Sequence, residues 1–275
     1  MDRQPRLTCV LAHPDDAAMA LGGLLAKYAA EGVATSLVIA TRGAEEWFDD
    51  PADYPGREQL GRVREAELRA AAADLGVGEL AVLDYHEGEL GLADPPEIIG
   101  RVAGQLRRLR PDVVITMDPL GFYGDPDHVA ICQYATAAAI AAADGAYATD
   151  PPGAPHRTAR LYYLAPDEAV LATWRAHFGR MRKLVDGVER APLGWPAWAI
   201  SARIDSAAYW RQAWGAVCRH GSQLPQRERL EGLPAETHQR LWCAHTLYRV
   251  SSFAGGGLAT EDDLFGGLRE GGSAG

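Results

Sequence analysis

The regular alternation of short apolar runs with longer helical ones constrains the fold of this sequence more than any other feature. We expect strands at residues 7–12, 35–41, 80–83, 112–117 and 161–164, and helices at residues 18–30, 59–75, 97–109 and 129–142. Strands that alternate with helices pair in parallel through right-handed crossovers. The pattern therefore predicts an α/β fold, a Rossmann-like three-layer sandwich with a mainly parallel sheet.

The 275 residues are expected to form one domain in three parts. Residues 1–165 form the α/β core. Residues 166–254 are less regular and rich in Trp, and we expect them to add helices and a small strand pair over the active edge of the sheet. Residues 255–275 are rich in Gly and are predicted to be a flexible tail. A chain of this size buries roughly three-quarters of its unfolded surface, so it needs no disulfide staples.

Charge and targeting signals limit the partners of the chain. A net charge of −10 argues against nucleic-acid binding, which needs clustered Lys and Arg. The four cysteines form no CxxC pair, which suits a reducing compartment. No signal peptide is visible, and the apolar stretch 135–143 is too short to span a bilayer. We expect a soluble cytoplasmic protein that works without a membrane or nucleic acid; a homo-oligomer remains open.

Two polar motifs lie where expected strands end and helices begin. The first reads Ala12-His13-Pro14-Asp15-Asp16, and the second reads Tyr123-Gly124-Asp125-Pro126-Asp127-His128. Ligand sites of open parallel sheets lie beyond the carboxyl ends of the strands. The two motifs are therefore expected to meet at one edge of the sheet, although they are more than 100 residues apart.

These residue types suit a divalent metal. Two imidazoles and one carboxylate form an acceptable Zn²⁺ set that leaves a position open for water. The metal lowers the pKa of that water to about 7, and a neighbouring carboxylate can accept its proton. Asp15 and Asp16 supply one ligand and one base, and the helix N-terminus helps to keep both ionised.

Other interpretations of the motifs remain. The first motif alone could be a His-Pro turn with an Asp cap, and the second a Gly/Pro/Asp turn. Two His and one carboxylate also form the site of non-haem iron oxygenases, although two residues rather than the usual one separate His13 from Asp16. No P-loop, dinucleotide fingerprint or Gly-x-Ser-x-Gly elbow is present.

The sequence resembles the LmbE-like, or PIG-L, family of zinc-dependent N-deacetylases, which includes the mycothiol-pathway deacetylases. The similarity runs from about residue 7 to residue 223. Both polar motifs carry it, together with supporting segments: Gly22-Gly23, Arg64 to Leu68, Leu75 to Val77, Tyr85 to Gly88, Asp118-Pro119 and His220 to Gln223.

The resemblance implies a role for each matching residue. It gives His13, Asp16 and His128 as Zn²⁺ ligands and Asp15 as general base. The residue types alone also leave open another divalent metal, such as Fe²⁺. Asp127 would orient one of the two histidines, and Tyr123 would reach the developing oxyanion. His220 could approach the site. The residues that would hold the substrate are Arg64, Glu45, Glu87 and His86.

Two positions depart from the family pattern. Ala17 stands where the family usually has Glu, and Asp125 where it usually has a His that is expected to stabilise the tetrahedral intermediate. An ionised Asp125 would repel a growing negative charge. Either Tyr123, His220 or the metal supplies the stabilisation, or the chemistry is altered or lost and the chain acts on another amide or as a binding protein.

With all three ligands and the base present, the resemblance favours a working enzyme. We expect it to remove an acyl group from the amide nitrogen of an amino sugar or a related small metabolite. The acyl group that we expect first is acetyl. Such an activity would suit secondary metabolism.

Overall fold

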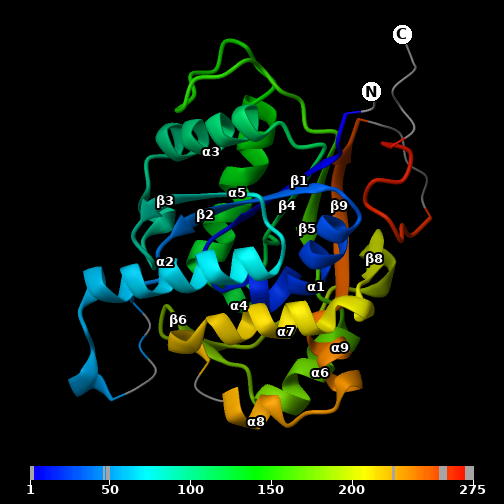
Figure 1. Cartoon of the computed structure of the whole chain (residues 1–275). Coiled ribbons are helices and arrows are strands. Elements are labelled where there is room, and N and C mark those ends of the chain that lie inside the picture. The colour runs from blue at the N-terminus through cyan, green and yellow to red at the C-terminus, as the bar shows by residue number, and fades with distance from the viewer. Residues whose placement is uncertain (1–2, 46, 48–49, 225–226, 254–258, 270–275) are drawn as a thin grey trace.

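The computed structural model describes residues 3–45, 47, 50–224, 227–253 and 259–269. A seven-stranded sheet lies at its centre, in the order β3-β2-β1-β4-β5-β9-β8 (Figure 1). Its first five strands are all parallel: β1 (Arg6–Leu11), β2 (Ala34–Thr41), β3 (Glu79–Tyr85), β4 (Val113–Thr116) and β5 (Arg160–Leu164). Strands β1, β2 and β4 are buried almost throughout, as expected for a parallel sheet covered on both faces.

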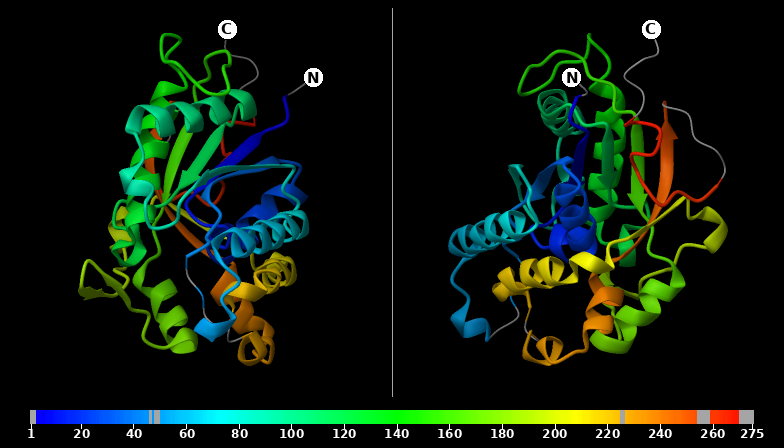
Figure 2. Two further views of the ribbon diagram at one scale, coloured as in Figure 1. Left: turned by 90° about the vertical axis from the view of Figure 1, so that its left-hand side faces the viewer. Right: turned by 45° about the vertical axis from the view of Figure 1, so that its right-hand side comes forward.

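Helices cover both faces of the sheet, which confirms the predicted three-layer α/β fold (Figure 2). The helices that connect the parallel strands are α1 (Asp16–Ala30), α2 (Arg57–Asp74), α3 (Pro95–Leu109), the single turn α4 (Gly121–Gly124) and α5 (Pro126–Ala141). Helix α3 packs against α5, whereas α1 and α2 both pack against α7 (Trp210–Arg219). Helix α1 is apolar nearly all round because it lies between the sheet and α7.

The final third of the chain contributes to the sheet as well as to the helical layer. The expected small strand pair is the hairpin β6 (Lys183–Val185) and β7 (Val188–Arg190). In addition, β9 (Ala244–Ser252) pairs antiparallel with β5, and β8 (Ala202–Asp205) pairs antiparallel with β9. These two strands, which the sequence did not predict, cover the edge that β5 would otherwise expose.

Three further helices, α6 (Glu168–Phe178), α8 (Arg227–Glu231) and α9 (Ala235–Trp242), gather with α7 at one end of the sheet (Figure 1). Short 3₁₀ turns complete the structure: η1 (Pro51–Asp53), η2 (Leu90–Leu92), η3 (Ala197–Ala199), η4 (Ala207–Tyr209) and η5 (Gly221–Gln223). Within the described ranges, no helix has both the length and the apolar composition that a membrane span requires.

Part of the expected flexible tail is packed onto the body of the protein. Leu264 and Phe265 are fully buried, and the Phe265 ring meets the edge of the Tyr28 ring at 5.2 Å between centroids. The Leu264 N–H donates to the Tyr28 hydroxyl at 2.8 Å. Burying a Leu and a Phe side chain holds residues 259–269 in place. The remaining stretches of the expected tail, 255–258 and 270–275, lie outside the described residues.

The contact between α1 and the final third depends on Gly23. A Cβ atom at Gly23 would collide with the Ser206 hydroxyl and lie 2.9 Å from the Trp242 carbonyl oxygen. We therefore expect Gly23→Ala to lower the free energy of unfolding by about 1–3 kcal/mol through overpacking. Urea denaturation measures this change.

The control is Gly215→Ala, which makes the same substitution inside α7. There the nearest atom that a new Cβ would meet is an Asp74 carboxylate oxygen at 3.9 Å. This variant should gain up to about 1 kcal/mol, because Ala loses less backbone entropy than Gly in a helix. Equal stabilities for the two variants would contradict the close packing at Gly23.

Candidate metal centre

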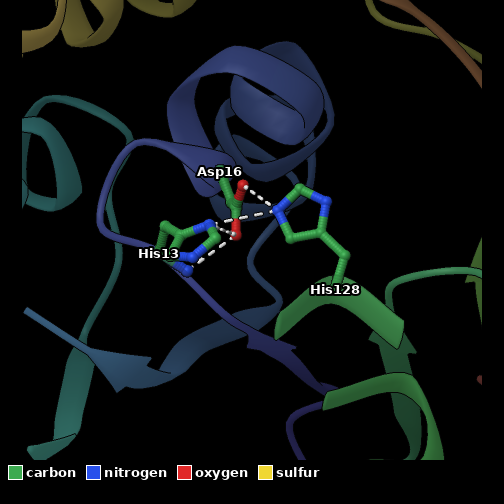
Figure 3. Close-up of side chains that lie close together, drawn as sticks. All are labelled: His13, Asp16 and His128. Atoms are coloured by element: carbon green, nitrogen blue, oxygen red, sulfur yellow. Dashed lines mark hydrogen bonds and ion pairs between the residues drawn. The ribbon is translucent and has the colours of Figure 1, made fainter. Parts of the chain in front are cut away.

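The two polar motifs meet at the carboxyl edge of the sheet, as their positions in the sequence predict. His13 follows β1, Asp16 begins α1, and His128 lies in the first turn of α5. Each offers a ligand atom, and these atoms all lie within 4.8 Å of one another (Figure 3). All three residues are at least nine-tenths buried. Among the described residues, this is the group of His, Cys, Asp and Glu side chains that could hold a metal ion.

The donor separations fit a small divalent cation. His13 Nδ1 lies 3.1 Å from His128 Nε2, and Asp16 Oδ1 lies 3.3 Å from the same His128 atom. Zn²⁺ bonds of about 2.0–2.1 Å in a tetrahedral site place neighbouring ligands roughly 3.3–3.4 Å apart. The His13 backbone N–H donates to Asp16 Oδ2 at 2.8 Å, which fixes the carboxylate between the two imidazoles.

Asp127 orients the first of these ligands. Its Oδ2 atom lies 3.2 Å from His13 Nε2, so that nitrogen donates its proton to Asp127 and Nδ1 is the nitrogen that an ion would bind in place of a proton. The same carboxylate accepts the backbone N–H groups of Gly88 at 2.7 Å and Leu90 at 3.0 Å. Burial disfavours a charged His13, but Asp127 and Asp16 outweigh it and raise the pKa of His13 to about 10. A cation at this point would neutralise the surplus negative charge.

The two adjacent carboxylates have different environments. Burial opposes ionisation of Asp16, yet the neighbouring His128 lowers its pKa. Asp15 is the N-cap residue of α1, but its side chain makes no capping hydrogen bond. Burial, followed by the charge of Asp16, raises the pKa of Asp15. The neighbouring histidines thus favour the ionised form of Asp16, whereas the raised pKa suits Asp15 to accept a proton.

Asp125 is a helix cap with a charged partner. Its Oδ1 atom accepts the backbone N–H groups of Asp127 at 2.9 Å and His128 at 3.2 Å, which fixes the first turn of α5. Its Oδ2 atom pairs with Lys183 Nζ at 2.7 Å. Burial would raise the pKa of Asp125, but His128, His13 and Lys183 hold it at about 2. The expected repulsion from Asp125 is therefore offset by Lys183, a residue that the sequence did not single out.

Of the other two expected catalytic residues, Tyr123 lies beside the metal ligands and His220 does not line the cavity next to them. Tyr123 lies beside the centre, with its ring centroid 6.4 Å from that of His128. His220 is fully buried at the end of α7 and does not line the cavity beside the ligands. Burial lowers the pKa of His220 to about 4. Ala17, the other departure from the family pattern, is buried in the apolar core.

Two of the four expected substrate residues line a polar hollow on the His13 side of the centre. Glu45 and Glu87 form its wall together with Asp125, Asp127 and Lys183. Glu87 accepts the Glu45 backbone N–H at 2.6 Å.

The other two expected substrate residues are not on that wall. Arg64 is fully buried and donates to the Gly43 carbonyl, with Glu87 at 3.8 Å, so it supports the loop beneath the hollow. His86 lies 3.1 Å from an Arg57 nitrogen and lines a separate hollow.

An apolar cavity of about 260 Å³ opens on the other side of the ligands. Asp15, Asp16, Tyr123 and His128 form its polar end. The rest of the wall includes Met19, Phe122, Leu164, Val170, Trp174, Phe178, Met181 and Trp242. Trp174 and Trp242 belong to the Trp-rich final third, which we expected over this edge of the sheet.

Comparisons with known proteins relate the chain to a family of de-N-acetylases. Residues 8–140 match the model of the family described as PIG-L, GlcNAc-PI de-N-acetylase. Over 290 aligned residues, the chain is 32% identical to a 1D-myo-inositol 2-acetamido-2-deoxy-α-D-glucopyranoside deacetylase of Salinispora arenicola. That alignment covers 96% of this chain and 91% of the relative.

Solved structures share the fold. The N,N′-diacetylchitobiose deacetylase of Pyrococcus horikoshii superposes with a TM-score of 0.66 at 19% identity, covering 89% of this chain and 83% of its own. The 4-carboxy-2-hydroxymuconate hydratase GalB of Pseudomonas putida KT2440 gives a TM-score of 0.62 at 20% identity, covering 93% and 100%. Since one of these proteins is named a hydratase, the fold alone does not decide the reaction.

Asp127 provides a test of the centre that does not depend on turnover. We expect Asp127→Asn to weaken Zn²⁺ binding about 10- to 100-fold, because the neutral amide no longer holds the His13 Nε2 proton as strongly. Competition with a chromophoric chelator measures the affinity. The control is Asp167→Asn, at a buried helix cap paired with Arg203 instead of a histidine. Unchanged affinity in Asp127→Asn would exclude the orienting role.

Proposed function

The chain belongs to the PIG-L family of de-N-acetylases, and on that premise we propose that it is a metal-dependent hydrolase of N-acylated amino sugars or related small metabolites. The observation that carries the proposal is the convergence of His13, Asp16 and His128 beside Asp15. The Salinispora arenicola relative is named as a deacetylase of an N-acetylated glucosamine derivative. The acetyl group is accordingly the first acyl group to test.

In the proposed mechanism, His13, Asp16 and His128 hold the ion. A bound Zn²⁺ would supply a Lewis acid for the amide carbonyl and make water acidic enough to lose a proton near neutral pH. Fe²⁺ suits the same donor set, and zinc is the metal that we propose. Asp127, through its contact with Nε2, would hold the His13 ring in place for Nδ1 to bind the ion.

The remaining steps use side chains of the chain itself. Asp15, with its raised pKa, accepts the proton of the attacking water and passes it to the departing nitrogen. The Tyr123 hydroxyl serves as a donor to the oxygen that gains negative charge. Lys183 offsets the charge of Asp125.

The polar hollow is the proposed place for the amine half of the substrate. Its carboxylates and its ammonium group match the hydroxyl groups of a sugar as acceptors and donors. Glu45, Glu87 and Lys183 would make these contacts. Arg64 supports the loop from beneath, and the proposal gives no contact to His86.

None of the named relatives favours the oxygenase or the non-catalytic alternative. A cytoplasmic location stays a prediction from the sequence, which leaves the oligomeric state open.

Turnover and metal content test the proposal together. The purified protein should release free amine from N-acetyl-D-glucosamine, lose this activity on chelation and regain it with Zn²⁺. Asp15→Asn should keep its metal but lose at least roughly 100-fold in kcat, because general-base catalysis contributes about 10²–10⁴-fold. Fluorescent detection of the amine and elemental analysis measure the two quantities.

The matched control is Asp94→Asn. Asp94 is likewise a helix N-cap residue without a capping hydrogen bond, but it is exposed at the start of α3. This variant should keep wild-type activity. Full activity in metal-free protein, or in Asp15→Asn, would overturn the proposed function.

A further inference from the structure

The apolar cavity beside the ligands offers few free polar groups away from its reactive end. The Asp118 carboxylate accepts the Trp195 indole N–H at 2.6 Å, and Thr246 Oγ1 donates to the Ala165 carbonyl at 2.7 Å. His245 is bonded through both ring nitrogens, to Ser206 Oγ at 3.0 Å and to the Ala20 carbonyl at 3.1 Å. Water therefore finds little to bind in the interior of this cavity.

The indole nitrogens on the wall are also satisfied within the protein. Trp174 Nε1 donates to the Leu241 carbonyl at 3.0 Å, and Trp242 Nε1 donates to His238 Nδ1 at 3.1 Å. The Trp174 and Phe122 rings pack edge to face with centroids 5.5 Å apart. These bonds fix the two indoles, so they present apolar ring surface to the cavity.

The apolar cavity has a larger volume than an acetyl group can fill. An apolar cavity of about 150 Å³ accommodates a benzene molecule, and the cavity here measures about 260 Å³. The single methyl of an acetyl group would leave most of its wall without contact, and the dispersion energy of those contacts would be lost.

The apolar cavity and the polar hollow suit different halves of an amide substrate whose carbonyl carbon lies beside the metal ligands. The apolar cavity is bounded by Asp16 and His128, and the polar hollow by His13 and Asp127. The hydroxylated amine half matches Glu45, Glu87 and Lys183 on the polar side. The acyl half then extends into the apolar cavity, past Tyr123 towards Trp174.

Resting on the proposed function, we propose that the acyl group this enzyme removes is larger than acetyl and apolar. The chemical class is an N-alkanoyl group of about six carbons, or an N-arylacyl group, on an amino sugar. Hydrolysis breaks the amide C–N bond and forms a C–O bond to the oxygen of water. The proton taken by Asp15 ends on the amine, and the fatty or aryl acid leaves from the apolar cavity.

A series of N-acyl-D-glucosamines tests the inference on the zinc-loaded enzyme. Acetyl, butanoyl, hexanoyl and phenylacetyl derivatives differ only in the group that the cavity would hold. Each buried methylene should raise kcat/KM up to roughly fourfold, so the hexanoyl compound should exceed the acetyl compound by roughly tenfold or more. The hexyl glycoside of N-acetylglucosamine, with its chain on the amine half, should gain nothing.

Val170 on α6 supplies the variant that narrows the cavity. In Val170→Phe, the ratio of kcat/KM for the hexanoyl and acetyl compounds should fall towards one. The matched control is Ala172→Phe, which adds a phenyl ring on the exposed face of the same helix and should keep the wild-type ratio.

Binding of the product acids to Asp15→Asn gives a readout without turnover. By calorimetry, hexanoate should bind roughly tenfold or more tightly than acetate. Hydrolysis of the acetyl compound with no gain for longer acyl groups would overturn this inference and leave the proposed function standing. A gain confined to the hexyl glycoside would assign the cavity to the amine half and also overturn it. If none of the amides is hydrolysed, the proposed function fails as well.

Discussion

The rest of the candidate metal centre depends on the contacts of the buried Asp127 carboxylate. It holds His13 through Nε2 and the loop after β3 through the backbone of Gly88 and Leu90. Because Asp127 lies in the first turn of α5, directly before His128, it ties both imidazoles to one rigid helix start. A charge buried this deeply must be paired, and its partners are the parts that have to meet. One side chain therefore links the two imidazoles of the candidate metal site to the loop that borders the polar hollow.

Asp125 extends this arrangement to the hairpin β6–β7. One of its oxygens caps α5 and the other pairs with Lys183, so the hairpin is attached to the helix that carries His128. Lys183 Nζ also lies 5.6 Å from the centroid of the Tyr123 ring. Asp125 replaces the His of the family pattern, which by itself suggests weaker stabilisation of the tetrahedral intermediate. The positive charge of Lys183 compensates for it, so Asp125 and Lys183 act as a pair.

The final third of the chain gives the site its second, apolar side. Helices α6 and α9 bring Trp174 and Trp242 over the carboxyl edge, and β9 anchors them by pairing with β5. At Gly23, helix α1 packs closely against the Trp242 backbone, and Asp15 and Asp16 lie at the start of the same helix. The same packing that completes the core therefore shapes the wall next to the reactive carboxylates.

The sequence by itself determined the succession of strands and helices along the first two-thirds of the chain, because local periodicity sets these elements. It also determined that the two motifs meet, because parallel pairing brings the carboxyl ends of the strands to one edge of the sheet. Only the tertiary structure decided that β8 and β9 extend the sheet, that Leu264 and Phe265 are packed, and that His220 is fully buried and is not part of the wall of the apolar cavity. It also decided the partnership of Asp125 with Lys183 and the opposite directions in which the pKa of Asp15 and that of Asp16 are shifted. These features depend on burial and on charges that lie far apart in the chain, and no local pattern of residues records such contacts.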